Sequence, residues 1–446
     1  MTRPRAVVLG FAGFGIAAAA ARADDALRSA VLADYRSALA PLFEHFHRNP
    51  ELSFREFKTA ERLASELRAL GYQVTEKVGG AGVVAVLRNG DGPTVMLRAD
   101  MDGLPIQERS GLAYASTARQ TDAAGVEQPV MHACGHDVHI TALVGSARQL
   151  MLRRGEWSGT LVLIGQPAEE KVGGARAMLA DGLYTRFPKP DYALAFHVSA
   201  ELPSGRVEVP LDAAYAGADT VEVVMRGFGG HGASPHKTID PVVMAAQTVM
   251  SLQTLVSRTI SPHRPGVVTV GAIHGGVRHN IIPDEVRMLL TVRSEDPETR
   301  KTLLEGIERV AAGTAKALGA PPDRMPIVTV EPDGTTPPTV NHHATALRVR
   351  DAMTRAMGEA RMIDKPREGM GAEDFAYFVQ PDLGVKGVYF QVGGTPEKDV
   401  PSAPSHHSAE FKIEPEPAVT SGVEATVVAA MAMMPKAAPP PALPTK

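Results

Sequence analysis

The stretch Thr160-Leu161-Val162-Leu163-Ile164-Gly165-Gln166-Pro167-Ala168-Glu169-Glu170 places two carboxylates directly behind a run of apolar residues. A short apolar run bounded by Gly or Pro is typical of a strand that is buried on both faces of a sheet. Proteins of the α/β class build their sites just beyond the carboxyl ends of such strands. The position of Glu169-Glu170 therefore predicts a functional site at this sheet edge.

Similar apolar runs recur along the chain and alternate with stretches that have the spacing of amphipathic helices. The predicted strands cover 83–87, 94–98, 160–164, 192–196 and 387–392, and helices are predicted within 31–70, 140–152 and 344–357. This alternation indicates an α/β domain with a mostly parallel central sheet.

A different order of elements begins near Ala218. Strands are predicted at 220–226, 267–272, 286–292 and 327–330, and helices at 241–256 and 297–318. The β-α-β-β-α-β order predicts a ferredoxin-like α+β unit that is inserted into the first domain. We expect a discontinuous first domain of residues 24–215 and 333–434, an inserted domain of residues 216–332, and a disordered Pro- and Ala-rich tail at 435–446.

The composition argues against several classes of partner. The chain has 46 Lys and Arg against 50 Asp and Glu, a formal net charge of −4, which gives no reason to expect nucleic acid or an anionic membrane as a partner. No stretch after the N-terminal segment is long and apolar enough to span a bilayer. The 446 residues suffice for two domains with a large buried core.

The first 23 residues have the pattern of a secretory signal peptide. Arg3 and Arg5 precede an apolar run from Ala6 to Ala21, and Ala21-Arg22-Ala23 has the spacing of a signal-peptidase site. A retained N-terminal helix is the alternative, and it is disfavoured because the run is short, rich in small residues and followed by polar Asp24-Asp25. We expect a periplasmic or secreted protein that is cleaved after about Ala23.

Cys134 is the single cysteine, so it cannot form an intramolecular disulfide. The residues alone leave two explanations open, which are a buried inert thiol and a thiolate that binds a metal. His136 follows across Gly135, and two such side chains can converge on one ion when the intervening residue is permissive. Asp137 could then accept a hydrogen bond from a ligand N–H.

Further ligand types follow other predicted strands: Glu169-Glu170, His197 and His406-His407. Thiolate, imidazole and carboxylate all bind Zn²⁺ and related divalent ions. If one Glu binds metal, its free neighbour can act as a general base on water, although most Glu-Glu pairs are simply solvated. The chain has no H-E-x-x-H and no G-x-S-x-G, which disfavours a zincin and an α/β-hydrolase.

Several segments, in one order, resemble the M20 family of metallopeptidases. The resemblance is to its amidohydrolase branch, which includes hippurate hydrolases, N-acyl amino acid amidohydrolases and hydrolases of indoleacetyl amino acids. The segments are His47–Ser53, Arg98–Pro105, Met131–His139, Gln166–Glu170, Gly229–His236, Asn280–Asp284 and Gly371–Phe375.

This resemblance implies two divalent ions per subunit, Zn²⁺ or Mn²⁺ in the first place and Co²⁺ or Ni²⁺ as alternatives. Glu169 would be the base that takes a proton from the attacking water. Asp100 is expected to support a ligand or the fold rather than to bind metal itself, because Arg98 stands where other branches have a histidine. His407 is preferred to His406 because it fits the family's His-x-x-x-Phe spacing. The implied metal ligands are Cys134, His136, Glu170, His197 and His407.

The inserted domain would be a lid and dimerisation domain, so a homodimer or higher homo-oligomer is expected. His231, which alone would pass for an ordinary turn histidine, would stabilise the oxyanion in its own or the partner subunit's site, and Asn280 would hold substrate. The expected reaction is amide hydrolysis of small N-acyl amino acids with apolar or aromatic acyl groups. A dipeptidase, carboxypeptidase or aminoacylase with the same site, and a non-catalytic periplasmic metal- or peptide-binding protein, are the alternatives.

Overall fold

The computed structural model describes residues 26–365 and 369–436. The predicted signal peptide and residues 437–446 of the predicted tail lie outside these ranges. At the described end of the chain, Pro435 forms a bridge with Trp157, and Lys436 Nζ donates to the carbonyl oxygen of Gly155 at 2.9 Å. The chain is thus ordered through Lys436, two residues beyond the expected end of the first domain.

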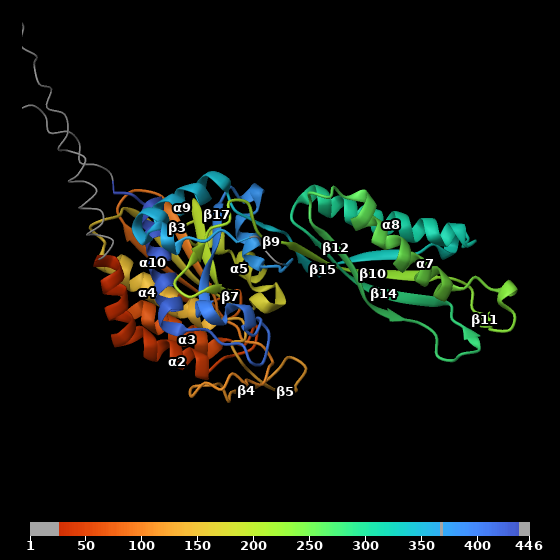
Figure 1. The fold of residues 1–446 in the computed structure, drawn as a ribbon, viewed down its shortest axis with the longest axis horizontal. Coiled ribbons are helices and arrows are strands. Elements are labelled where there is room, and N and C mark those ends of the chain that lie inside the picture. The colour runs from red at the N-terminus through yellow and green to blue at the C-terminus, as the bar shows by residue number, and fades with distance from the viewer. Residues whose placement is uncertain (1–25, 366–368, 437–446) are drawn as a thin grey trace, which may run out of the picture.

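A seven-stranded sheet forms the centre of the first unit (Figure 1). Its order is β1 (Gln73–Val78), β2 (Gly82–Asn89), β6 (Gly159–Gln166), β3 (Thr94–Asp100), β7 (Tyr192–Pro203), β17 (Lys386–Thr395) and β8 (Val207–Glu208). The four strands β6, β3, β7 and β17 are parallel, whereas β1, β2 and β8 pair antiparallel.

The prediction of a mostly parallel sheet is therefore correct for the centre and wrong at both edges. The reason lies in the connections, since a short link reverses the chain whereas a parallel pair needs a long crossover. Residues 79–81 join β1 to β2, and residues 90–93 join β2 to β3. Both links are too short for a crossover.

Helices cover both faces of this sheet. The side chains of Leu161 and Leu163 enter one core and those of Val162 and Ile164 the other, which explains why the whole run is apolar. One core is covered by α2 (Ala40–Arg48), α3 (Phe57–Ala69), α4 (His136–Leu152), α9 (His343–Met357) and α10 (Pro415–Met433). The other is covered by α5 (Gly174–Ala180), α6 (Leu183–Arg186) and the 3₁₀ helix η7 (Asp374–Val379).

A second unit has its own antiparallel sheet and its own core. Its order is β12 (Gly266–His274), β14 (Glu285–Ser294), β10 (Gly217–Arg226) and β15 (Ile327–Thr336), with α7 (Pro241–Thr254) and α8 (Pro297–Ala317) packed against it. The β-α-β-β-α-β order that the sequence predicted is confirmed. The domain boundaries at 216 and 332 stay a prediction.

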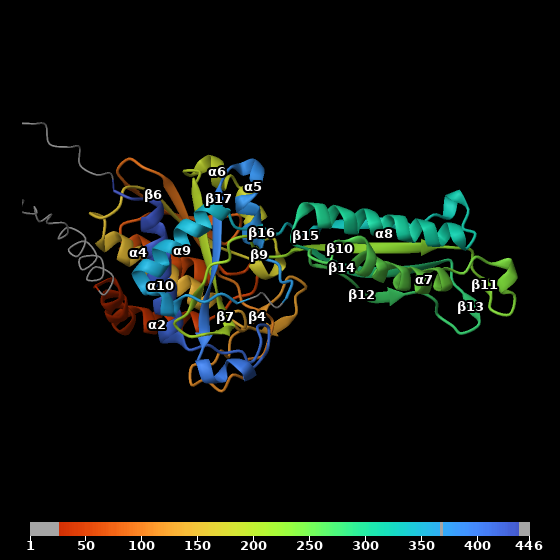
Figure 2. The ribbon, with the colours of Figure 1, turned by 45° about the horizontal axis from the view of Figure 1, so that its top comes forward.

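The two units lie end to end and form an elongated molecule (Figures 1 and 2). The short strands β11 (Gly230–His231) and β13 (Ile281–Ile282) pair at the tip of the second unit, at the end remote from the seven-stranded sheet. Within the described ranges, no helix is long and apolar enough to cross a membrane.

Candidate metal centre and active site

The metal-ligand candidates meet near the carboxyl ends of β3 and β6, where α4 begins, and His197 reaches this point from within β7. Cys134 lies in the turn before α4, and His136 is the first residue of that helix. Gly135 between them has φ +85°, and a Cβ on it would lie 2.3 Å from Val198 Cγ1. Only glycine fits this turn, which brings the thiol and the imidazole to the same side.

The five predicted ligands and the predicted base form one cluster. Cys134 Sγ lies 3.4 Å from His197 Nε2, and His407 Nε2 lies 3.2 Å from Glu170 Oε2. His136 Nε2 lies 3.9 Å from Glu170 Oε1 and 4.0 Å from Glu169 Oε2. Two groups of potential ligands share the thiol, namely Cys134 with His136 and His197, and Cys134 with Glu170 and His407.

The donor set fits divalent metal ions. Among the described residues, the buried atoms His136 Nε2 and Glu170 Oε1 have no hydrogen-bond partner, although they face the middle of the cluster. Buried polar atoms are rarely left unsatisfied, and an ion would supply the missing interaction. Thiolate, imidazole and carboxylate are suitable ligands for Zn²⁺ and neighbouring transition metals.

Hydrogen bonds fix which ring nitrogen of two histidines faces the cluster. His136 Nδ1 donates to the carbonyl oxygen of Asp102 at 2.9 Å, and His197 Nδ1 donates to that of Val198 at 2.7 Å. Each ring therefore presents an unprotonated Nε2 when neutral, as a metal ligand must.

His139 and His406 lie close by, but their rings are oriented differently. His139 Nδ1 lies 2.5 Å from Asp100 Oδ1, while its Nε2 accepts from the N–H of Val198 at 2.9 Å. His406 Nε2 accepts from the N–H of Ala200 at 3.1 Å, which leaves its proton on Nδ1, 3.7 Å from Cys134 Sγ. Burial lowers the pKa of His406 to about 3, so the ring is neutral. This geometry supports His407 over His406 as the ligand.

Asp100 is committed to structural contacts, in line with the sequence-based expectation. Its Oδ2 accepts from Arg98 Nη1 at 2.5 Å, and its other oxygen faces His139. The fully buried Arg98 also donates to Glu373 Oε1 at 2.7 Å and contacts Asp374 at 3.3 Å. This network was not predicted, although Gly371–Phe375 was one of the segments that carried the resemblance.

Glu169 lies beside the cluster and is buried. Its backbone N–H donates to Asp102 Oδ1 at 3.2 Å, and that of Glu170 donates to Asp102 Oδ2 at 3.1 Å. Burial, together with the nearby carboxylates of Glu373 and Glu170, raises the pKa of Glu169 well above its usual range. This carboxyl can therefore accept a proton and hold it, which is what a general base requires.

The cluster opens into a cavity of about 600 Å³ that lies between the two units. Cys134, Glu169 and His407 line one side, together with Tyr215 and Gly371. Side chains of the second sheet line the opposite side, namely Thr220 of β10 and both Thr291 and Arg293 of β14. The volume suits a small organic molecule.

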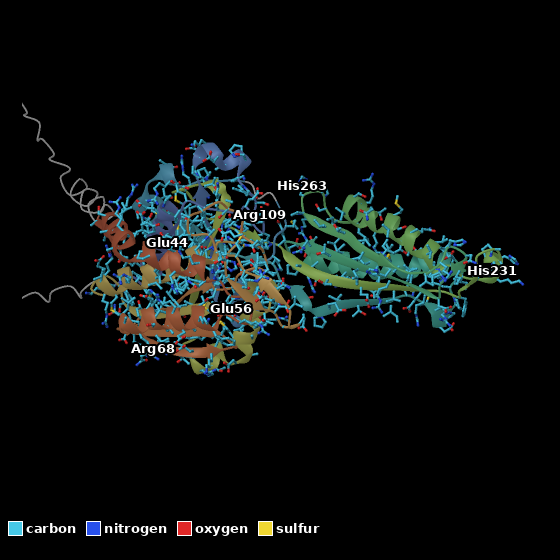
Figure 3. The ribbon with its side chains drawn as sticks, turned by 90° about the horizontal axis from the view of Figure 1, so that it is seen from below. Glu44, Glu56, Arg68, Arg109, His231 and His263 are labelled. Atoms are coloured by element: carbon cyan, nitrogen blue, oxygen red, sulfur yellow. The ribbon has the colours of Figure 1, made fainter. Side chains whose placement is uncertain are left out.

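The structure does not bring His231 or Asn280 to this cavity in the same chain. His231 pairs with Ile281, and the carbonyl oxygen of Asn280 accepts from the N–H of Gly232 at 2.9 Å. Both residues thus lie at the tip of the second unit, where Figure 3 shows His231 far from Glu56 of the first unit. His231 Nδ1 accepts from the N–H of Ala233 at 3.0 Å, which leaves Nε2 as the free nitrogen.

A buried carboxyl beside a cluster of metal-binding side chains, open to a cleft, is the site of a metal-dependent hydrolase. Residues 96–431 match Peptidase family M20/M25/M40. The chain belongs to this family and is a metal-dependent hydrolase that acts on amide or peptide bonds.

Relatives with related activities cover most of the chain. Thermostable carboxypeptidase 2 of Saccharolobus solfataricus is 35% identical over 366 residues, which are 81% of this chain and 87% of that protein. Hippurate hydrolase of Campylobacter jejuni is 35% identical over 351 residues, 78% of this chain and 86% of that protein. The solved structure of Bacillus subtilis YXEP, a dinuclear metal-binding peptidase of the M20 family, has a TM-score of 0.73 at 27% identity and covers 90% of this chain and 99% of its own.

Proposed function

We propose that the protein hydrolyses the amide bond of N-acyl amino acids with apolar or aromatic acyl groups. The observation that carries this proposal is the cavity itself, which has the metal-binding cluster and Glu169 on one wall and the Arg293 guanidinium on the other. The similarity to a hippurate hydrolase supports the same substrate class.

Arg293 is suited to bind the carboxylate of the amino acid. Among the described residues it forms no ion pair, and its Nε donates only to Thr291 Oγ1 at 3.1 Å. Asp219, whose charge acts on Arg293, is already bound by Arg300 through two contacts of 2.7 and 2.9 Å. The second sheet therefore offers a free, partly buried cation to the cleft, where a substrate carboxylate would form a charge-assisted hydrogen bond.

The residues of the cluster divide the chemistry between them. Cys134, His136, Glu170, His197 and His407 would hold two divalent ions, Zn²⁺ or Mn²⁺ in the first place, with Co²⁺ or Ni²⁺ as alternatives. When bound, the ions would polarise the scissile carbonyl and make water a better nucleophile at neutral pH. Glu169 takes the proton from the attacking water and delivers it to the leaving amine.

The second sheet also supports a homodimer. Helix α7 contains no charged residue, and its exposed face carries Val243, Ala246 and Met250 at helical spacing. Strand β12 has one unpaired edge, with Ile273 exposed. Because an uncharged open edge is prone to pair with another chain, we assign this surface to a second copy. His231 and Asn280 at the tip then serve the partner subunit's cavity, His231 at the oxyanion and Asn280 on the substrate.

Glu169→Gln tests the chemistry. We expect kcat to fall by about 10²–10⁴-fold, because general acid–base catalysis is lost, while the metal content measured by elemental analysis stays that of the wild type. Retained hydrolysis would contradict the role of Glu169, and loss of metal would show that Glu169 is a ligand.

A substrate panel decides between the proposal and the alternative of a carboxypeptidase, dipeptidase or aminoacylase, which the S. solfataricus relative supports. N-benzoyl amino acids, N-acetyl amino acids and free dipeptides are compared at equal concentration. The highest kcat/KM is expected for the N-benzoyl series. Metal binding without turnover of any substrate in the panel would favour a non-catalytic binding protein.

Export remains a prediction from the sequence. The signal peptide falls on residues outside the described ranges, so the proposed mature start near Asp24 depends on the sequence pattern. N-terminal sequencing of protein recovered from the periplasm or medium checks it, and an intact Met1 would contradict it.

A further inference from the structure

The segment His47–Ser53 takes no part in the proposed chemistry, yet its buried side chains His47 and Ser53 bind the carboxylates of Asp137 and Asp102, close to the candidate ligands. Neither faces the cavity. His47 lies in the last turn of α2, and Ser53 lies in the connection that leads to α3. Each is bound to a carboxylate that in turn contacts the elements carrying the candidate ligands.

His47 joins two buried carboxylates. Its Nδ1 lies 2.7 Å from Asp137 Oδ2, and its Nε2 lies 3.1 Å from Glu108 Oε1. Because each nitrogen faces a carboxylate oxygen, both donate and the ring is an imidazolium. Tyr114 packs edge-on against this ring, with 4.9 Å between the centroids, and helps to exclude water.

Asp137 transmits this contact to the metal centre. It directly follows His136, and its second oxygen accepts from the N–H of Val138 at 2.9 Å. The first turn of α4 is therefore held between its own backbone and His47. His136 begins that turn and Cys134 shortly precedes it, so the positions of both residues depend on where the turn is held.

Ser53 acts through a second carboxylate, that of Asp102. Its hydroxyl donates to Asp102 Oδ2 at 2.7 Å. The same Asp102 carboxylate accepts the backbone N–H groups of Glu169 and Glu170, and its carbonyl oxygen accepts from His136 Nδ1. One fully buried residue thus connects the acidic pair to a ligand histidine, and Ser53 fixes its orientation.

We propose that His47–Ser53 is a brace for the metal centre, in which His47 and Ser53 are positioning residues that hold the ligands at the geometry the ions require. This inference rests on the proposed two-metal function. The competing explanation is that both contacts stabilise the fold in general and have no particular effect on the metal.

Metal affinity separates the two explanations. The variants His47→Gln and Ser53→Ala are stripped of metal, and the Kd for Zn²⁺ alone is measured by competition with a chromophoric chelator. If the brace positions the ligands, both variants bind Zn²⁺ about tenfold or more weakly, within the range of about 10–100-fold that loss of an outer contact to a metal site costs.

Arg361→Met is the matched control. Arg361 forms a largely buried ion pair with Glu424 at 2.5 Å in the same unit, and neither residue contacts a candidate ligand. This variant should lower the Tm of the metal-free protein while leaving the Kd for Zn²⁺ at the wild-type value. The brace is refuted if His47→Gln and Ser53→Ala lower Tm but, like Arg361→Met, leave the Kd unchanged.

Ser53→Ala keeps the inference testable even if His47→Gln does not fold, because it removes a single hydroxyl. An unchanged Kd in this variant alone refutes the role of Ser53, and Asp137→Asn then decides that of His47. No substrate enters the measurement, so failure of the brace is distinguishable from failure of the proposed amide hydrolysis.

Discussion

Three buried histidine rings and the partly buried ring of His406 lie around the metal centre, and the contact made by the second ring nitrogen decides the role of each. His136 and His197 donate Nδ1 to carbonyl oxygens and turn Nε2 inward, whereas His139 and His406 use both nitrogens in contacts with protein groups. A histidine in the right place is therefore a good ligand only when its backbone neighbours fix the right tautomer. The sequence indicated His136, His197 and His406 as potential ligands, whereas His139 appeared only as the end of the segment Met131–His139, and no tautomer could be assigned.

The Arg293 guanidinium gives a prediction at the scale of one residue. Arg293→Met should lower kcat/KM for an N-benzoyl amino acid by about 10–100-fold, because a charge-assisted hydrogen bond of roughly 1.5–3 kcal/mol is lost. The same amino acid with its carboxylate converted to an amide serves as control and should be hydrolysed equally by both proteins. An equal loss on both substrates would contradict carboxylate binding by Arg293.

His47 gives a second prediction, on the pH dependence of stability. Burial alone would lower its pKa, but the hydrogen bonds to Asp137 and Glu108 raise it to about 9 from the ordinary value of 6.5. Because the pKa of His47 is higher in the folded state, the protonated ring stabilises the fold. This stabilisation is fully present below pH 6.5 and is lost as pH rises through 9. The shift corresponds to about 3 kcal/mol.

Urea denaturation of the metal-free protein at about pH 6 and about pH 9.5 measures this effect. Between these two pH values, the free energy of unfolding of the wild type should fall by about 3 kcal/mol more than that of His47→Gln, since the variant lacks the titrating ring. Equal losses in the two proteins would show that His47 does not titrate in this range.

At the scale of elements, the sequence predicted the strands and helices that are marked by the periodicity of apolar residues and by Gly or Pro at their ends. The strands around 160–164 and 192–196 were expected, and the acidic pair follows the end of the first one as anticipated. The second strand continues to Pro203, so the prediction that His197 follows the end of its strand is wrong. Helix α10 was missed because most of its residues are buried, which removes the amphipathic pattern that marks a helix. The antiparallel edges were missed because pairing direction depends on the links rather than on strand composition.

Long-range polar contacts escaped prediction for a different reason. His47 meets Glu108 and Asp137, and Arg98 meets Glu373, across separations that no local pattern encodes. Such pairs form only after the sheet has brought their elements together.

Helix α7 gives a prediction at this scale. Val243→Glu places a charge on its exposed apolar face, which should destabilise the proposed dimer because the carboxylate would have to be desolvated in the interface. Light scattering should show a monomer that keeps its far-ultraviolet circular dichroism. Glu305→Gln on the exposed face of α8 is the control and should stay dimeric. A dimeric Val243→Glu protein would contradict the assignment of this surface.

At the scale of the whole molecule, the main finding is that the tip with His231 and Asn280 lies far from the metal centre of its own chain (Figure 3). In a twofold dimer, each tip can instead reach the other subunit. Mixing Glu169→Gln subunits with His231→Ala subunits then creates dimers in which one site has both Glu169 and His231.

If His231 acts on the partner subunit's site, subunit exchange between these two inactive proteins should restore about a quarter of wild-type activity. Half of the random dimers are mixed, and each mixed dimer has one intact site. Native mass spectrometry confirms the exchange. If exchange is complete and activity stays at the level of the separate variants, His231 does not act in the partner subunit's site.

The distance between tip and metal centre has a consequence for how activity depends on dilution. A single subunit would bind its metal ions but lack the partner's histidine that completes the site, so it would contain metal and yet be inactive. Specific activity should then fall when the protein is diluted below the Kd of the dimer, while the ratio of metal to protein remains constant. For an exported protein, a requirement for the dimer would confine hydrolysis to places where the protein reaches a high concentration, and dissociated subunits would be inactive.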